Sequence, residues 1–101
     1  MKLIEMFLPL TDNSGRKLPK KAFADTRREL IERFGGLTAY SRTPARGFWK
    51  GKGKVARDEI VVFEVMAKRR EGRFWRNYRR KLEKRFRQEA IVIRMMDCET
   101  L

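Results

Sequence analysis

Three charged side chains interrupt stretches that otherwise have the composition of buried β-strands: Glu5, Glu64 and Arg94. Because side chains alternate between the two faces of a strand, each of them is predicted to lie on the same face of a common sheet. An arginine favours ionised carboxylates, whereas burial and a second carboxylate raise a carboxyl pKa. The pattern is compatible with a small polar-ligand site between two sheets, or with an ion-pair network that fixes the register of a dimer.

The residue types that are missing exclude several classes of active site. The chain contains no histidine, which removes histidine-based metal sites, catalytic triads and the commonest general base. Cys98 is the single cysteine and has no histidine partner for nucleophilic catalysis. No glycine-rich phosphate loop of the P-loop or dinucleotide type is present. We therefore expect no metal and no cofactor, we assign no catalytic residue, and we favour a protein that is not an enzyme.

The charge balance is the most unusual property of the chain. Lysine and arginine number 26 against 13 aspartates and glutamates, which gives a formal net charge of +13. Residues 42–87 hold 17 basic and 5 acidic side chains, so the excess lies in the middle of the chain. Such a balance indicates a polyanion partner, such as nucleic acid or an anionic membrane surface, or else a surface charged for solubility.

The predicted polyanion-binding surface combines a helix over about residues 73–87 with the basic hairpin and the basic turn that precede it. One side of this helix is apolar, and arginine and lysine recur on the opposite side. The predicted contact residues are Lys50, Lys52, Lys54, Arg69, Arg70, Arg73, Arg76, Arg80, Lys84 and Arg87. Trp49 is a candidate for stacking on unpaired bases. The alternative for the helix is an ordinary solvated face.

The elements that position these residues follow from apolar periodicity and turn residues. The strongest strand signal is residues 59–67, EIVVFEVMA, and residues 2–8, 37–42 and 90–96 are the other predicted strands. Pro44 is expected to end the second strand, before a separate extended piece over residues 47–50. Helices are predicted over residues 19–34 and 73–87. The order β-α-β-β-α-β predicts one α+β, ferredoxin-like domain over residues 1–101, with a four-stranded antiparallel sheet and two helices on one face.

Period-two alternation divides the strand residues into two sets. The uniformly apolar set should face the helices: Ile4, Met6, Leu8, Val61, Phe63, Val65, Ile91, Ile93 and Met95. The second set is also mostly apolar: Leu3, Glu5, Phe7, Ile60, Val62, Glu64, Met66, Val92, Arg94 and Met96. An extended apolar face is normally an interaction surface. We therefore predict a homo-oligomer, a dimer or a larger α+β barrel, that forms through this open sheet face.

The first helix is predicted to bury one side and to expose its charges. Phe23, Thr26, Leu30, Ile31 and Phe34 fall on the inner side at helical spacing, whereas Asp25, Arg28, Glu29, Glu32 and Arg33 fall mainly outside. The chain has no transmembrane run, and its N-terminal apolar stretch contains Glu5 and lacks a cleavage site, which argues against a signal peptide. A single cysteine fits a reducing compartment, so the expected location is the cytoplasm.

Four segments, LIEMFLPLTDNSG, ERFGGLTAYSRTPARG, ARDEIVVFEVM and RFRQEAIVIR, resemble a family of small uncharacterised bacterial proteins. The resemblance implies a ferredoxin-like fold and α+β-barrel assembly, and it implies no activity. The basic segments GKGK and RNYRRKLEKR depart from the family pattern, which leaves an engineered, positively charged variant open.

Three functional hypotheses follow. The first is a non-enzymatic, oligomeric module that engages nucleic acid or another polyanion through the second helix and the basic hairpin. The second is a small-ligand protein or enzyme of α+β-barrel type that uses the second sheet face. The third is a structural or engineered scaffold whose charge serves solubility or cargo loading.

Overall fold

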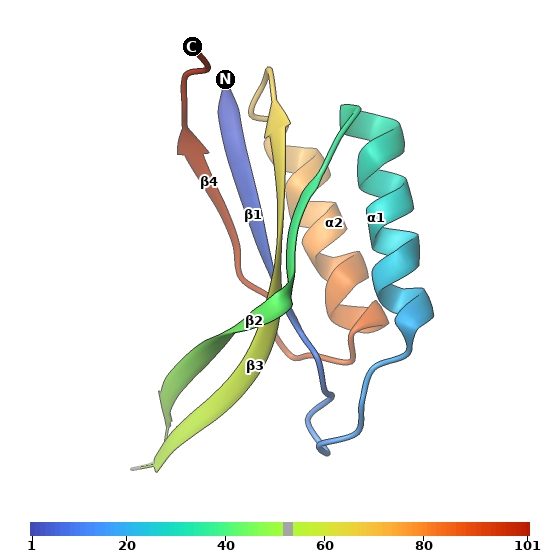
Figure 1. Ribbon diagram of the computed structural model, residues 1–101, viewed down its shortest axis with the longest axis vertical. Coiled ribbons are helices and arrows are strands. Elements are labelled where there is room, and N and C mark those ends of the chain that lie inside the picture. Colours follow the sequence, from blue (N-terminus) through green and yellow to red (C-terminus); the bar gives the residue numbers. More distant parts are fainter. Residues whose placement is uncertain (52–53) are drawn as a thin grey trace.

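The computed structural model describes the chain over residues 1–51 and 54–101, and its side chains over residues 1–40 and 59–101. Its elements are β1 (Lys2–Pro9), α1 (Lys20–Phe34), β2 (Thr38–Gly51), β3 (Lys54–Ala67), α2 (Gly72–Arg85) and β4 (Ile93–Asp97). The strands form a four-stranded sheet in the order β2-β3-β1-β4, with antiparallel neighbours. Both helices lie side by side against one face of the sheet (Figure 1). The predicted ferredoxin-like architecture is confirmed.

The core lies between the sheet and the helices, and its composition follows the alternation of the strands. Of the predicted helix-facing set, Ile4, Met6, Leu8, Val61, Phe63, Val65 and Ile91 are buried, and Ile93 and Met95 pack against them half-buried. The helices contribute Ala22 and Leu30 from α1, and Trp75, Tyr78 and Leu82 from α2. Each helix therefore buries one apolar stripe against one face of the sheet, as its period predicts.

The second strand differs from the prediction. β2 is one long strand that passes through Pro44, where the sequence predicts a break. Within the described sheet, β2 is an edge strand whose partner is β3, and the register shifts between Tyr40 and Ala45. Proline lacks an N–H donor, which an edge strand tolerates at an irregularity of the ladder.

Several element ends and one buried position also differ. α2 ends at Arg85, two residues earlier than predicted, and Arg87 adopts a left-handed conformation with φ 53°. β4 begins at Ile93 and not at residue 90. Ile31 on α1 is exposed, whereas Ala22 takes a place in the core. Gly35 ends α1 with φ 83°, the left-handed cap that its sequence predicts.

Candidate functional site

The strand register brings Glu5, Glu64 and Arg94 together in one row across the open face of the sheet. Glu5 lies on the central strand β1, directly opposite Glu64 on β3 and directly opposite Arg94 on β4. Sequence alternation predicts only that the three residues share a face. The additional fact is adjacency, because residues directly opposite each other on antiparallel strands have Cβ atoms about 5 Å apart.

Arg94 anchors one end of this row. Its Nη2 donates a hydrogen bond to Glu5 Oε1 at 2.9 Å, and its guanidinium carbon lies 4.6 Å from the centre of the Phe7 ring. The Glu5 side chain is 14% exposed, whereas that of Arg94 is 58% exposed. Arg94 therefore has further N–H groups directed at solvent or at a partner, and Glu5 has its charge compensated within the sheet.

Glu64 is the unusual carboxyl of the row. Burial raises its pKa above the ordinary value, and the neighbouring Glu5 carboxyl raises it further, whereas a hydrogen bond with Tyr40 lowers it. The Glu64 charge in turn raises the pKa of the Tyr40 hydroxyl. Glu64 also lines a hollow of about 410 Å³ together with Leu3 and Met66. The group can hold a proton at a higher pH than a solvated glutamate, next to a space that a small molecule can enter.

Apolar side chains surround the polar row, although over a smaller area than predicted. Met66, Val92 and Met96 are 50%, 42% and 40% exposed. Ile60 and Val62 were expected on the same open face, and both are buried. The open face therefore offers a moderate apolar surface that surrounds a polar centre.

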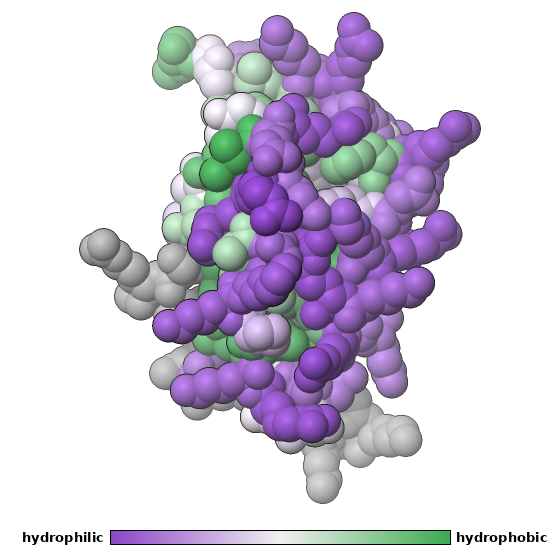
Figure 2. All heavy atoms as spheres, turned by 90° about the vertical axis from the view of Figure 1, so that its right-hand side faces the viewer, coloured by the Kyte–Doolittle hydropathy of each residue, from purple (hydrophilic) through white to green (hydrophobic). Residues whose placement is uncertain are grey.

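The described part of the predicted basic surface, on α2 and the turn before it, lies on the opposite side of the molecule. Among its residues, Arg69, Arg70, Arg73, Arg76, Arg80, Lys84 and Arg87 are exposed. Figure 2 shows that the side carrying the two helices is covered by hydrophilic side chains. Arg73, Arg76, Arg80 and Lys84, which we call the α2 stripe, form no ion pair with any residue whose side chain is described. Their charge is therefore open to an external anion.

The remaining residues of the predicted polyanion-binding surface either lie elsewhere than predicted or fall outside the described residues. Arg87 lies beyond the end of α2, and its Nη1 is 3.8 Å from Asp12 Oδ2, so an acidic neighbour partly neutralises it. The side chains of Lys50, Lys54 and Trp49 lie outside the described residues, as does Lys52 altogether. The hairpin half of the predicted surface thus stays a prediction.

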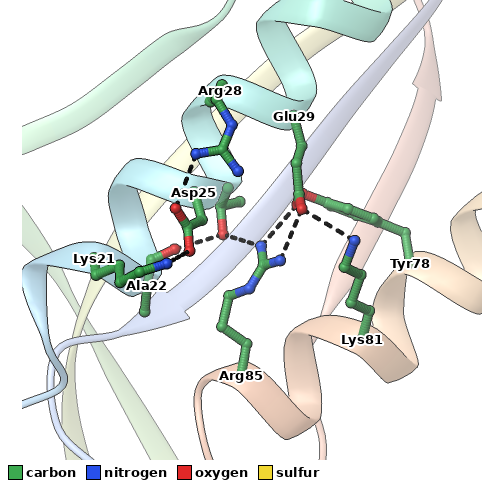
Figure 3. Close-up of polar contacts among 9 residues, drawn as sticks. Lys21, Ala22, Asp25, Arg28, Glu29, Tyr78, Lys81 and Arg85 are labelled. Atoms are coloured by element: carbon green, nitrogen blue, oxygen red, sulfur yellow. Dashed lines mark hydrogen bonds and ion pairs between the residues drawn. The ribbon is translucent and has the colours of Figure 1, made fainter.

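A polar network between the helices was missed by sequence reasoning (Figure 3). Arg85 on α2 makes a bidentate pair with Glu29 on α1, at 2.8 Å for both bonds. Lys81 Nζ lies 3.0 Å from the same carboxylate, and the Tyr78 hydroxyl donates to it at 2.9 Å. Arg85 also donates to Thr26 Oγ1, which itself donates to the backbone carbonyl of Ala22.

The network lowers the basicity of the Glu29 carboxylate. Hydrogen bonds from Arg85, and then from Lys81 and Tyr78, lower the pKa of Glu29 to about 2 despite partial burial. Burial and the Glu29 carboxylate raise the pKa of Tyr78 far above its ordinary range. Glu29 was predicted to lie mainly outside, but it is half-buried between the helices. Such a satisfied group joins the helices and offers no free proton acceptor near neutral pH.

Among the residues with described side chains, no group of three or more histidine, cysteine, aspartate or glutamate residues is placed to hold a metal ion. Within the described part of the chain, no helix is both long and apolar enough to cross a membrane. The free thiol of Cys98 is half-buried at the end of β4.

Comparison with known proteins places the fold. No protein-family model and no curated protein matches the chain. Among solved structures, CutA1 from Pyrococcus horikoshii is 14% identical with a TM-score of 0.63, over 100% of this chain and 86% of its own. The PII-like protein CutA from Nostoc sp. PCC 7120, in apo form, is 14% identical with a TM-score of 0.61, over 98% of this chain and 82% of its own.

A third structure with this fold is a phage SAM lyase in complex with S-methyl-5'-thioadenosine. It is 13% identical, with a TM-score of 0.63, over 95% of this chain and 80% of its own. At such low identity the likeness shows a shared fold and carries no shared activity.

Proposed function

We propose that this protein is a non-enzymatic, oligomeric binding module that engages nucleic acid or another polyanion through the outer face of α2. The α2 stripe carries the proposal, because its four cations are exposed and have no acidic partner among the described side chains. Most other described cations of the helices are committed to carboxylates: Lys21 and Arg28 to Asp25, and Lys81 and Arg85 to Glu29. Within α2, the cations that no described carboxylate pairs with are thus concentrated on its outer face.

The spacing of the stripe suits a linear anion. Arg76, Arg80 and Lys84 follow one another at four-residue intervals, so their Cα atoms rise by about 6 Å at each step of the helix. Cations in such a row can neutralise successive phosphates and release their condensed counterions. Binding should therefore weaken steeply with salt and show little base preference.

The test is fluorescence anisotropy with labelled single-stranded DNA, double-stranded DNA and RNA at several salt concentrations. Replacing Arg76, Arg80 and Lys84 with glutamate should reduce affinity more than tenfold. It should also reduce the salt slope on a single strand by about 2, because each lost phosphate contact removes roughly 0.7. Heparin serves as a competing polyanion, and equal binding to heparin and to every nucleic acid would favour the scaffold interpretation.

A charge-matched control separates the stripe from net charge. Lys17, Lys20 and Arg27 are exposed, and no described side chain pairs with them. Replacing these three with glutamate changes the net charge by the same amount and should change affinity by less than about threefold. Equal losses in the two triple variants would show that net charge, and not the α2 stripe, drives binding.

The oligomeric part of the proposal rests on the open sheet face. This face combines exposed Met66, Val92 and Met96 with the compensated Glu5–Arg94 pair, so a second copy can cover it without meeting the cations of the helix side. Sedimentation velocity should show a dimer or larger assembly. Val92→Glu should shift it to monomer, whereas Ile31→Glu, at an equally exposed apolar residue on α1, should not. Dissociation by Ile31→Glu alone would place the interface on the helices.

A second candidate function uses Glu64. Its raised pKa, the contact with Tyr40 and the hollow of about 410 Å³ favour a site for a small polar ligand. S-methyl-5'-thioadenosine is a reasonable first probe, because the phage SAM lyase of similar fold was solved with it. Calorimetric binding that Glu64→Gln abolishes would favour this function. If S-methyl-5'-thioadenosine does not bind to the wild-type protein, this class of ligand is excluded.

A further inference from the structure

A small hollow between the first turns of α2 and the helix-facing side of β4 is surrounded by guanidinium groups. Its volume is about 150 Å³, and Arg70, Arg76 and Arg79 line it together with Gly72 and Trp75. Arg70 comes from the turn before α2, whereas Arg76 and Arg79 come from its second helical turn. Three cations from two segments thus meet around one space, and no acidic residue described in the structure lines it.

This convergence is electrostatically unfavourable unless an anion neutralises it. Like charges that share a small space repel one another, and the repulsion grows where protein displaces water. The single described carboxylate in contact is Glu83, which lies 4.0 Å from Arg79 Nε. Arg70 and Arg76 have no ion-pair partner among the described side chains. Surplus positive charge therefore remains at the hollow.

The backbone beside the hollow leaves space and N–H groups for an anion. A Cβ atom at Gly72 would stand 3.1 Å from Arg76 Nη1, so the absence of a side chain lets this guanidinium lie over the start of α2. No acidic residue occupies the first turn, and Glu71 gives no side-chain cap because its carboxylate binds Arg33. The first N–H groups of α2 are thus available, next to the guanidinium groups.

Trp75 lines the hollow and can report on it. The side chain is 5% exposed, and its Nε1 is buried without a hydrogen-bond partner among the described residues. Because this N–H has almost no accessible surface, the indole lines the hollow without donating to an anion in it, and its resonance serves as a local probe of binding.

We propose that this hollow binds one phosphate monoester group. Guanidinium groups bind phosphate oxygens in bidentate geometry, and a terminal phosphoryl group offers three such oxygens whereas a phosphodiester offers two. The dianionic monoester also neutralises more of the surplus charge than a diester does. The inference extends the proposed polyanion function, since the hollow adjoins the α2 stripe and shares Arg76 with it. It would hold the end of a nucleic acid, or a small phosphorylated metabolite.

The first test does not depend on polyanion binding. Inorganic phosphate is titrated into the ¹⁵N-labelled protein, and the Gly72 amide and the Trp75 indole Nε1–H resonances are followed. Both should shift with a common saturation curve. Arg70→Gln with Arg79→Gln should weaken binding about tenfold or more, whereas the matched pair Arg80→Gln with Lys84→Gln should leave it within twofold. Shifts at exposed cations alone, with these two resonances unmoved, would overturn the proposal.

A substitution at Gly72 separates loss of phosphate binding from loss of the fold. Gly72→Ala should retain or improve helix stability, since alanine is the better helix former, while its methyl crowds Arg76 and narrows the hollow. Phosphate affinity should fall several-fold in a protein that is fully folded by circular dichroism. Unchanged affinity in this variant would contradict the predicted position of the anion.

The second test distinguishes the two sources of the phosphate. An oligonucleotide with a 5'-phosphate should bind several-fold more tightly than the same strand with a 5'-hydroxyl. The double variant Arg70→Gln, Arg79→Gln should abolish this difference and leave the affinity for the 5'-hydroxyl strand unchanged. If phosphate and adenosine monophosphate bind but the two strands bind equally, the site serves small phosphomonoesters. If the strands bind equally and phosphate does not bind, the hollow is no phosphate site even where the α2 stripe retains polyanion binding.

Discussion

Two glutamates on opposite sides of the sheet show how placement decides the state of a carboxyl group. Glu29 lies between the helices, where Arg85, Lys81 and Tyr78 all donate to it and lower its pKa to about 2. Glu64 lies on the open face, where burial and the Glu5 carboxyl raise its pKa. In a chain with 26 basic residues, one carboxyl is surrounded by cations and the other faces a carboxyl.

The difference teaches which side of the molecule is built for stability. The helix side pairs the half-buried Glu29 carboxylate with three donors and packs a continuous apolar core. The open face keeps a perturbed carboxyl, an exposed arginine and exposed methionines together, and perturbed groups of this kind cluster at functional sites. The two sides should therefore respond differently to substitution and to pH.

The largest contrast is expected from apolar truncation. Phe63, which is 1% exposed toward the helices, and Met66, which is 50% exposed on the open face, lie on the same strand. In the monomeric Val92→Glu background, Phe63→Ala should lower the free energy of unfolding by about 3–5 kcal/mol, whereas Met66→Ala should cost under about 1 kcal/mol. Urea denaturation of both variants, with Phe63→Leu as a milder substitute, measures this. Similar costs in this background would mean that Met66 packs against its own chain.

The next largest effect is expected at acidic pH, where protonation of Glu29 should destabilise the fold. The pKa of Glu29 in the folded protein lies below its unfolded value, so its contribution is fully present above about pH 5 and is lost as the pH falls towards 2. From the size of the shift, the contribution at neutral pH is roughly 3 kcal/mol at most.

Glu29→Gln should therefore lower stability at pH 7 by about 2 kcal/mol and flatten the loss of stability between pH 5 and pH 2. Thermal unfolding followed across this pH range measures both effects. A double variant with Arg85→Met should cost less than the two single changes together, because the single changes each leave a partly buried partner unpaired. Additive costs would show that the pair is not coupled.

Glu64 should show the opposite sign and a smaller size. Its folded pKa lies above its unfolded value, so ionisation weakens the fold as the pH rises through this range. Glu64→Gln should leave stability at pH 7 unchanged or raise it by less than about 1 kcal/mol. Carbon-detected NMR titration of the side chain checks the direction directly. A midpoint below that of a free glutamate would contradict it.

The smallest expected effect is at Arg94, which compensates Glu5 across the strands. Arg94→Met should cost under about 1 kcal/mol, because the guanidinium is largely exposed. It should also raise the pKa of Glu64 further, since removing a cation leaves the Glu5 and Glu64 carboxyls less compensated. The titration midpoint of Glu64 in this variant is the measurement. Lys2→Met, which removes a cation at the end of the same sheet, should move the midpoint less.

Sequence periodicity predicted the helix-facing side well, because alternation along strands and a helical stripe directly encode burial. It also placed Glu5, Glu64 and Arg94 on one face. It did not predict that they are neighbours, because register depends on pairing between strands. Tyr40 was missed as a partner of Glu64 for the same reason, because its place opposite Val62, two residues from Glu64, also depends on the register between β2 and β3.

The Glu29–Arg85 pair was missed for a different reason. A helical wheel treats each helix alone, and Glu29 and Arg85 both lie at the edge of their apolar stripes. Whether such an edge faces solvent or the neighbouring helix depends on how the two helices pack. Similarly, the hollow at Gly72 combines residues from a turn and two helical turns, and no linear pattern marks it.

The strand order β2-β3-β1-β4 has a consequence for motion within the fold. β1 pairs with β3 along its length and with β4 along its first half, and its inward side chains Ile4, Met6 and Leu8 have no exposed surface. Amide hydrogens of β1 point alternately towards β3 and β4, so those bonded to the long strand β3 should exchange only on global unfolding. Those of the short edge strand β4 should exchange by local opening. One labelling time course therefore ranks the elements, with the central N-terminal strand slowest to exchange.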